Sequence, residues 1–384
     1  MLTSITLKEY TTFIKETTFD FKATNYKILE NTNVGTNRIL KGALFIGENA
    51  SGKTKVLDSI VLLLDILLEN EEQVFIAMKS LYTKGEKFNI SYKFNIENNE
   101  LNYELEFYKN TINQEKLYLN NQIIIERLKE NGNTYHEKDK KEVNNIEPTL
   151  SLVKQEYYNN RFNNNSILNK WIEYLKNSIY INCVKREIKG YYPGKSFEQT
   201  IYKYAEKNSP TKINEFLTKL GYNSEVDFHE NNILDVEAFK KHKSIITLRK
   251  KGTKIALPLQ FESSGNQAFM SIILPIIYAT KNDGMIIIDE FSSGLHNELE
   301  ESLIKYFFNN SKNSQMFFVT HSTNILDNFL IRPDQIYSLH FDSKEGTIVK
   351  RFSDENPRES QNLERMYLNG VFDGKPTYSK EFKD

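Results

Sequence analysis

One stretch of the sequence decides the fold: Gly47-Glu48-Asn49-Ala50-Ser51-Gly52-Lys53-Thr54. Its spacing, G-x-x-x-x-G-K-[ST], is that of a phosphate-binding loop, or P-loop. An apolar run over 43–46 predicts a strand before the loop, and apolar residues at helical spacing over 56–67 predict a helix after it. In that setting, backbone N–H groups and the helix N-terminus surround a phosphate. We expect Lys53 to reach the β and γ phosphates of a nucleotide and the Thr54 hydroxyl to bind Mg²⁺.

A second motif lies at residues 285–290, which read MIIIDE. An apolar run that ends in two carboxylates is typical of a buried parallel strand with acids at the ligand edge of the sheet. We expect Asp289 to hold Mg²⁺ through water, and Glu290 to orient and deprotonate the water that attacks the γ-phosphate. An apolar strand ending in Asp is common by itself. Together with the P-loop it predicts ATP hydrolysis.

A third motif, the signature segment, spans residues 262–267 with the sequence ESSGNQ, before a predicted helix over 266–280. A Ser-Gly pair at a helix start supplies a hydroxyl, free N–H groups and the positive end of the helix dipole. Ser264, Gly265 and Gln267 are therefore candidate nucleotide-binding residues. One chain has no second phosphate for them, so we expect two copies to meet head to tail. The alternative is that Ser264 only caps the helix.

A histidine ends the apolar strand predicted over 317–320. His321 is placed to hydrogen-bond the γ-phosphate and report its presence, which would make it part of the catalytic set with Glu290. A single histidine at a strand end is more often structural. Its position on the strand that follows Asp289 favours the sensor role.

The rest of the chain reads as an α/β protein. Helices and strands alternate from 266 to 341, including a helix over 323–330, which predicts a mainly parallel core sheet. Alternating strands over 88–125 predict an antiparallel β lobe, 129–150 reads as a loop, 151–220 as helical, and 244–259 as a hairpin. We therefore predict a first lobe at 1–128 with the P-loop, a helical insertion at 129–240, and a second lobe at 241–384.

Composition limits the function classes. The 384 residues include 50 Lys and Arg against 51 Asp and Glu, so the overall charge does not suggest a protein that coats nucleic acid. A single cysteine, Cys183, excludes an intrachain disulfide and a multi-cysteine zinc site. No signal peptide or membrane-length apolar run is readable, and we expect a cytoplasmic protein without membrane contact.

One local basic cluster stands out. Residues 240–254, from Lys240 to Lys254, contain seven Lys or Arg and no acid. The cluster could bind nucleic-acid phosphates. We favour the simpler interpretation, a solvated hairpin edge on which lysines discourage pairing with other edges.

The order of the four motifs resembles that of ABC-type ATPase heads. GENASGKT, ESSGNQ, IIIDEFSSGLH and FFVTHS together are similar to bacterial ATPases allied to the overcoming-lysogenisation-defect proteins, over nearly the whole chain. The resemblance implies an ABC-type head that uses ATP and Mg²⁺ and forms a homo-oligomer. Asn266 replaces the second glycine of the usual signature. For the family's glutamine loop the nearest residue is Gln114, although a solvated polar residue in a hairpin is the better interpretation.

Several relatives in this group are the ATPase partners of phage-defence pairs, such as the PARIS, Rlo, abortive-infection and Septu systems. The resemblance thus implies a toxin–antitoxin-like subunit that senses a phage trigger and holds or activates an effector. Only 63 residues follow His321, so we expect the effector, a Toprim or HNH nuclease, to be a separate chain. Two alternatives stay open. One is a DNA-binding repair ATPase like the RecF and SMC heads, disfavoured because no long heptad stretch is present. The other is a slow switch in which ATP is structural.

Overall fold

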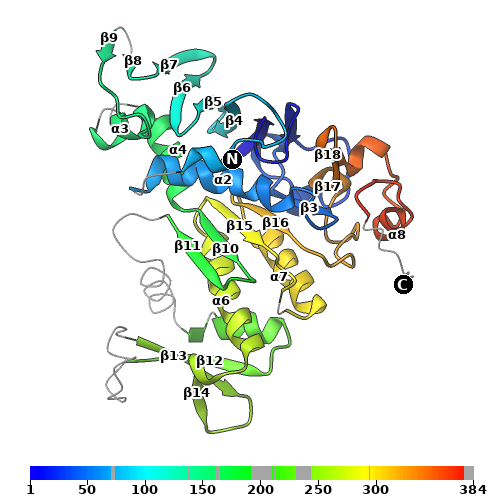
Figure 1. Ribbon diagram of the computed structural model, residues 1–384. Coiled ribbons are helices and arrows are strands. Elements are labelled where there is room, and N and C mark those ends of the chain that lie inside the picture. Colours follow the sequence, from blue (N-terminus) through cyan, green and yellow to red (C-terminus); the bar gives the residue numbers. More distant parts are fainter. Residues whose placement is uncertain are drawn as a thin grey trace, which may run out of the picture.

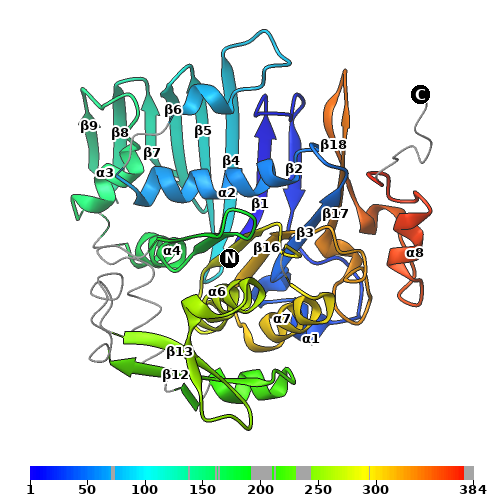
Figure 2. The same ribbon diagram turned by 60° about the horizontal axis from the view of Figure 1, so that its bottom comes forward.

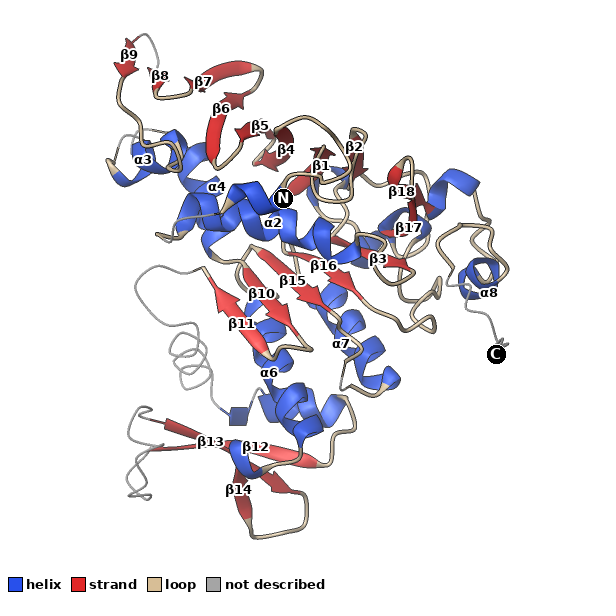
Figure 3. Cartoon of the chain, in the orientation of Figure 1, coloured by secondary structure: helices blue, strands red, loops and turns tan. Residues whose placement is uncertain are grey.

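The computed structural model describes residues 1–70, 74–136, 139–160, 162, 165–191, 210–211, 213–230, 244–293 and 295–375. Two large sheets stack with helices between and below them, and a small third sheet lies at one end (Figure 1). Figure 3 shows the same arrangement with helices and strands in separate colours.

The core sheet has seven strands in the order β11-β10-β15-β16-β3-β17-β18. The five central strands are parallel, and the two outer strands run antiparallel to their neighbours. This arrangement confirms the predicted parallel core. The strands are β3 (Gly42–Gly47), β10 (Ile179–Asn182), β11 (Glu187–Gly190), β15 (Met285–Asp289), β16 (Gln315–Val319), β17 (Ile336–Asp342) and β18 (Gly346–Arg351).

Three long helices cover the core sheet on both faces. Helix α2 (Lys53–Leu68) lies between the two large sheets, and α6 (Ser264–Ala279) and α7 (Asn297–Asn310) lie on the far face of the core (Figure 2). Successive residues of β3 point to opposite sides: Phe45 packs in the cluster that contains α2, and Leu44 in the cluster that contains α6 and α7. Burial on both faces explains why the core strands are almost purely apolar.

The second large sheet is antiparallel, with eight strands in the order β2-β1-β4-β5-β6-β7-β8-β9. Its inner face packs on α2 and α4, where the buried Trp171 contacts the rings of Phe94 and Tyr103. The strands and covering helices are β1 (Leu2–Lys8), β2 (Thr17–Asp20), β4 (Lys87–Ile96), β5 (Asn99–Tyr108), β6 (Thr111–Leu119), β7 (Gln122–Leu128), β8 (Asn131–His136), β9 (Asp139–Val143), α3 (Leu152–Tyr158) and α4 (Ser166–Lys176).

The third sheet contains the predicted hairpin. Its order is β12-β13-β14, with β12 (Ser224–Glu230), β13 (Ser244–Lys250) and β14 (Ala256–Pro258). The remaining short elements are α1 (Glu30–Asn33), α8 (Leu363–Leu368) and the 3-10 turns η1 (Thr36–Arg38), η2 (Phe75–Met78), η4 (Leu259–Phe261), η5 (Pro333–Gln335) and η6 (Phe352–Glu355). No helix in the described part of the chain is both long enough and apolar enough to cross a membrane.

Three secondary-structure predictions were wrong. The polar segment 129–150 contains β8 and β9, which extend the antiparallel sheet as its outermost strands. Within 151–220, helices are present, but β10 and β11 also join the core sheet. Residues 323–330 form turns instead of a helix, because the Asp327 carboxylate accepts the backbone N–H of Phe329 and competes with helical hydrogen bonds. The three domain boundaries stay a prediction.

Candidate nucleotide-binding and hydrolysis site

The P-loop connects β3 to α2 and needs glycine at two positions. Gly47 has φ 149°, and a Cβ there would lie 2.0 Å from the Leu339 carbonyl oxygen of β17. Gly52 has φ 102° and precedes the first turn of α2. Ser51 is fully buried, and its Oγ has no hydrogen-bond partner among the described residues. A buried hydroxyl without a hydrogen-bond partner, in a glycine-rich turn, fits a loop that can bind a phosphate.

Lys53 lies inside this loop. Its side chain is buried, and Nζ donates to the carbonyl oxygens of Gly47 at 2.9 Å and Glu48 at 2.6 Å. Burial lowers the pKa of Lys53, while the nearby Glu290 and Asp289 act in the opposite direction. An ammonium held only by carbonyl dipoles gains a stronger, charge-assisted partner when a phosphate enters the loop. The side chain is therefore placed for its predicted role.

Asp289, at the end of β15, faces the start of α2. Thr54 Oγ1 donates to its Oδ1 at 3.1 Å, so the two predicted Mg²⁺ ligands are in contact. Burial raises the pKa of Asp289 to about 6. Both ligand atoms are hard oxygens, which Mg²⁺ prefers. Among the described residues, no group of three or more His, Cys, Asp or Glu side chains is arranged to hold a metal ion without further ligands. The pair thus fits an ion that keeps water and phosphate oxygens as its other ligands.

Asn182 is a site residue that sequence reasoning missed. It ends β10, opposite Asp289 in the parallel register, and its Nδ2 donates to Asp289 Oδ2 at 3.1 Å. Asn182 Oδ1 in turn accepts the Lys185 backbone N–H at 2.8 Å. Gln114 instead lies on β6, paired with Glu106 and Leu128, and no described contact joins it to the P-loop. Among the described hydrogen bonds, the side-chain amide that contacts Asp289 is therefore that of Asn182.

Glu290 and His321 form a direct contact. His321 Nε2 lies 3.1 Å from Glu290 Oε2, across the neighbouring strands β15 and β16. Glu290 has φ 57°, a left-handed conformation that is uncommon outside glycine and is often found at functional sites. The hydrogen bond with His321 lowers the pKa of Glu290. Both predicted catalytic residues meet beside Asp289.

The signature segment lies apart from this cluster. Ser263, not Ser264, caps α6, because its side chain accepts the Asn266 backbone N–H. Ser264 and Gly265 are exposed, and within the described ranges no hydrogen bond involves the Ser264 hydroxyl. The Gln267 side-chain amide donates to the backbone carbonyl oxygens of Gln260 and Glu262. The Ser264 hydroxyl is therefore available to an incoming ligand, and the nucleotide-binding roles of Ser264, Gly265 and Gln267 stay a prediction.

The basic cluster is only partly described. Lys240, Lys241 and Lys243 lie outside the described residues. The other four cations are exposed around the turn between β13 and β14, and one of them, Arg249, pairs with Glu225 on β12 at 2.5 Å. The exposed cations of this turn are Arg249, Lys250, Lys251 and Lys254.

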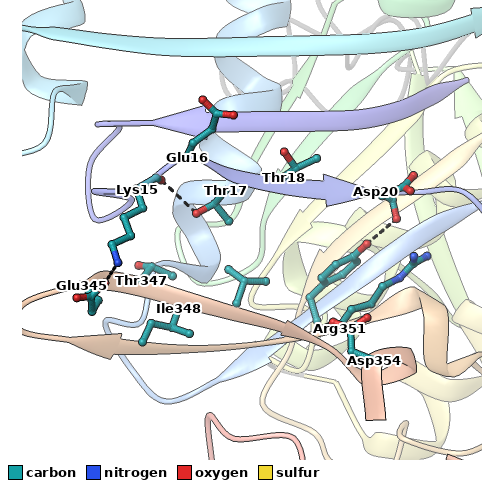
Figure 4. Close-up of a pocket in the computed structure, with 12 residues that line it drawn as sticks. Lys15, Glu16, Thr17, Thr18, Asp20, Glu345, Thr347, Ile348, Arg351 and Asp354 are labelled. Atoms are coloured by element: carbon teal, nitrogen blue, oxygen red, sulfur yellow. Dashed lines mark hydrogen bonds and ion pairs between the residues drawn. The ribbon is translucent and has the colours of Figure 1, made fainter. Parts of the chain in front are cut away.

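A separate pocket of about 600 Å³ lies between the edge strands β2 and β18 (Figure 4). Lys15 and Glu345 form an ion pair across it. None of the predicted nucleotide-binding residues lines it. It adjoins the P-loop through Thr347, whose hydroxyl donates to the Ser51 carbonyl oxygen at 2.9 Å. Thr347 thus links β18, which borders this pocket, to the P-loop.

A comparison with protein families matches residues 43–327 to the family described as "AAA domain, putative AbiEii toxin, Type IV TA system". The chain belongs to this family. The match covers well over half of the chain, from β3 past His321, and so includes all four motifs. A comparison with curated proteins gave no match.

Solved structures with a similar fold show which fold this chain has. The SMC head domain from Thermotoga maritima is 14% identical, with a TM-score of 0.50 over 91% of this chain and 97% of that chain. An SMC head bound to the C-winged helix domain of ScpA is 13% identical, with a TM-score of 0.55 over 92% of this chain and 99% of that chain. The predicted ABC-type head fold is thereby confirmed. The family match supports a nucleotide-binding AAA-type P-loop ATPase domain, and the solved structures show that its fold is that of an SMC head.

Proposed function

We propose that this chain binds ATP with Mg²⁺ and hydrolyses it. The observation that carries the proposal is the meeting of the P-loop, both acids and the histidine, through the Thr54–Asp289 and Glu290–His321 contacts. Lys53 would bind the terminal phosphates, and Thr54 and Asp289 would hold Mg²⁺, which neutralises phosphate charge when bound. Glu290 would take a proton from the attacking water, while His321 hydrogen-bonds the γ-phosphate.

The proposal includes a head-to-tail dimer. Ser264 and Gly265 are exposed, and among the described residues no hydrogen bond joins them to the P-loop of their own chain. In a pair of chains, each signature segment would contact the nucleotide on the other chain's P-loop. A symmetric pair closes with two equivalent sites, as most homo-oligomers do.

The substitution Glu290→Gln tests both parts. It removes the base and keeps the shape, so the variant should retain ATP and Mg²⁺, hydrolyse ATP at least about 100-fold more slowly, and accumulate as a dimer. Multi-angle light scattering and bound-nucleotide analysis report these properties. Lys53→Ala is the control, and should retain no nucleotide. A Glu290→Gln variant with unchanged turnover would contradict the assigned base.

We further propose that the ATPase serves phage defence in the cytoplasm. The family description, with its reference to a toxin–antitoxin system, and the resemblance to defence-pair ATPases support this role. The assembled ATPase would hold a separate effector, of Toprim or HNH nuclease type, until a phage-encoded trigger releases or activates it. Co-expression with the adjacent gene tests the pairing. A copurifying nuclease and plaque protection that requires Lys53 are expected; an absence of both would contradict the role.

DNA binding is the second candidate function. Likeness to SMC heads and the exposed cations at the β13–β14 turn favour it. If it is correct, duplex DNA should be retained in an ATP-dependent and salt-sensitive way, without any partner protein. Replacing Lys250 and Lys251 by Glu should then abolish retention and leave turnover unchanged. Retention that survives this charge reversal would exclude the turn as the DNA-binding surface.

A further inference from the structure

A buried carboxylate on α7 has no role in the site as described so far. Glu300 is fully buried, and its Oε2 accepts the Ser322 hydroxyl at 2.7 Å. Its other oxygen, Oε1, has no hydrogen-bond partner among the described residues. Burial raises the pKa of Glu300. Leaving a buried acceptor unpaired is unfavourable, so simple packing does not explain this residue.

Glu300 holds both neighbours of His321. Ser322 binds it on one side, and the Thr320 side chain interacts with the same carboxylate from the other. The Ser322 backbone N–H also donates to Thr320 Oγ1 at 3.1 Å, which closes a tight turn at residues 320–322. His321 itself is 44% exposed and makes its side-chain contact with Glu290. The turn is thus fixed from inside, while the imidazole projects outward.

We infer that Glu300 is a positioning residue for ATP hydrolysis: it fixes the turn at 320–322 so that the His321 imidazole stays directed at Glu290 and at the γ-phosphate. The inference rests on the proposed function. Glu300 touches neither the reacting atoms nor the P-loop in the described contacts. Removing it should therefore slow the chemical step and leave ATP binding intact, because Lys53 and Thr54 are unaffected.

The test compares Glu300→Ala with Glu300→Gln in the full chain. The alanine variant loses the acceptor for the Ser322 hydroxyl. The kcat should then fall about 10- to 100-fold, because a small displacement of a catalytic group slows the chemical step by such a factor. The Kd for ATP should stay within about twofold. Gln keeps an acceptor oxygen, so Glu300→Gln should lie within about threefold of the unmodified kcat. The matched control is Glu301→Ala, because the Glu301 carboxylate accepts the side-chain N–H of Asn324, further along the loop, and its removal should leave kcat unchanged.

A second variant separates positioning from general destabilisation. Ser322→Ala removes the other partner of the hydrogen bond, so the double variant with Glu300→Ala should lose no more activity than Glu300→Ala alone. The inference is overturned if Glu300→Ala keeps kcat within twofold, if its Kd for ATP rises as much as kcat falls, or if Glu301→Ala loses as much activity. Absence of turnover in the unmodified protein would instead overturn the proposed function, and this inference with it.

Discussion

The two nucleotide-binding motifs of this chain differ in how far the fold supports them. The P-loop is enclosed: Ser51 and Lys53 are buried, and β17 and β18 contact the loop from behind. In the signature segment, Ser264 and Gly265 are exposed. The described side-chain hydrogen bonds of this segment join it to Tyr222 and Gln260 and to its own Glu262. The difference supports the proposed dimer, in which each chain would bind ATP at its enclosed P-loop and offer its exposed signature segment to the other chain's nucleotide.

The largest effect is expected at the enclosed half. Lys53→Ala should weaken ATP binding at least about 100-fold, since a charged hydrogen bond to phosphate contributes about 3 kcal/mol. Isothermal titration calorimetry measures this change. The matched control is Lys55→Ala, which removes a partly exposed lysine two residues further along α2 that pairs with Asp58. If Lys53→Ala bound ATP as tightly as the unmodified chain does, the P-loop would not be the enclosed half of the ATP site, and the comparison would be wrong.

A substitution in the exposed signature segment should lower turnover without changing the ATP affinity of the isolated chain. Ser264→Arg blocks the start of α6 with a bulky side chain, so turnover should fall about 100-fold, as when a phosphate-directed donor is lost. ATP affinity of the isolated chain should be unchanged, because its own P-loop is intact. Turnover and calorimetry on one preparation measure both quantities. If ATP affinity fell together with turnover, Ser264 would serve its own chain.

A smaller effect is expected at Asn182, which supports the enclosed half from β10. Asn182→Ala removes the hydrogen bond to Asp289 Oδ2, and the Mg²⁺ concentration for half-maximal turnover should rise about tenfold, as for other residues that orient metal ligands. Gln114→Ala is the control and should behave like the unmodified chain. The reverse result would restore Gln114 as the glutamine-loop residue.

The smallest effect separates two neighbouring serines. Ser263 caps α6, so Ser263→Ala should lower stability by about 1 kcal/mol. Ser264→Ala should leave stability unchanged, because within the described residues its hydroxyl makes no hydrogen bond. Thermal denaturation measures both variants. Equal destabilisation would return Ser264 to the role of a helix cap.

The enclosed half was largely predictable from the sequence. The spacing of residues 47–54 and the apolar strand before Asp289 each imply a definite local structure, and parallel strands then bring their carboxyl ends to one edge. The contact between Thr54 and Asp289 follows from that topology. The direct contact between Glu290 and His321 does not, because it depends on side-chain geometry across β15 and β16.

The missed features share a physical cause. Strand β10 has only four residues and follows α4 closely, so its identity depends on pairing with β15, not on a local pattern. Asn182 was therefore missed. Strands β8 and β9 are polar and end the antiparallel sheet, with β9 at its edge, where an apolar alternation is not required. Glu300 was missed because its partner Ser322 lies in a turn directly before residues 323–330, which we expected to form a helix.

Mixing two inactive variants tests the central claim most directly. Lys53→Ala lacks a working P-loop and Ser264→Arg lacks a working signature segment, so neither should hydrolyse ATP alone. In a mixed head-to-tail pair, one of the two sites combines an intact P-loop with an intact signature segment. The account predicts that the mixture regains turnover, up to about one quarter of the unmodified rate for random pairing with one active site in each mixed dimer. Turnover no greater than the sum of the separate variants would contradict it.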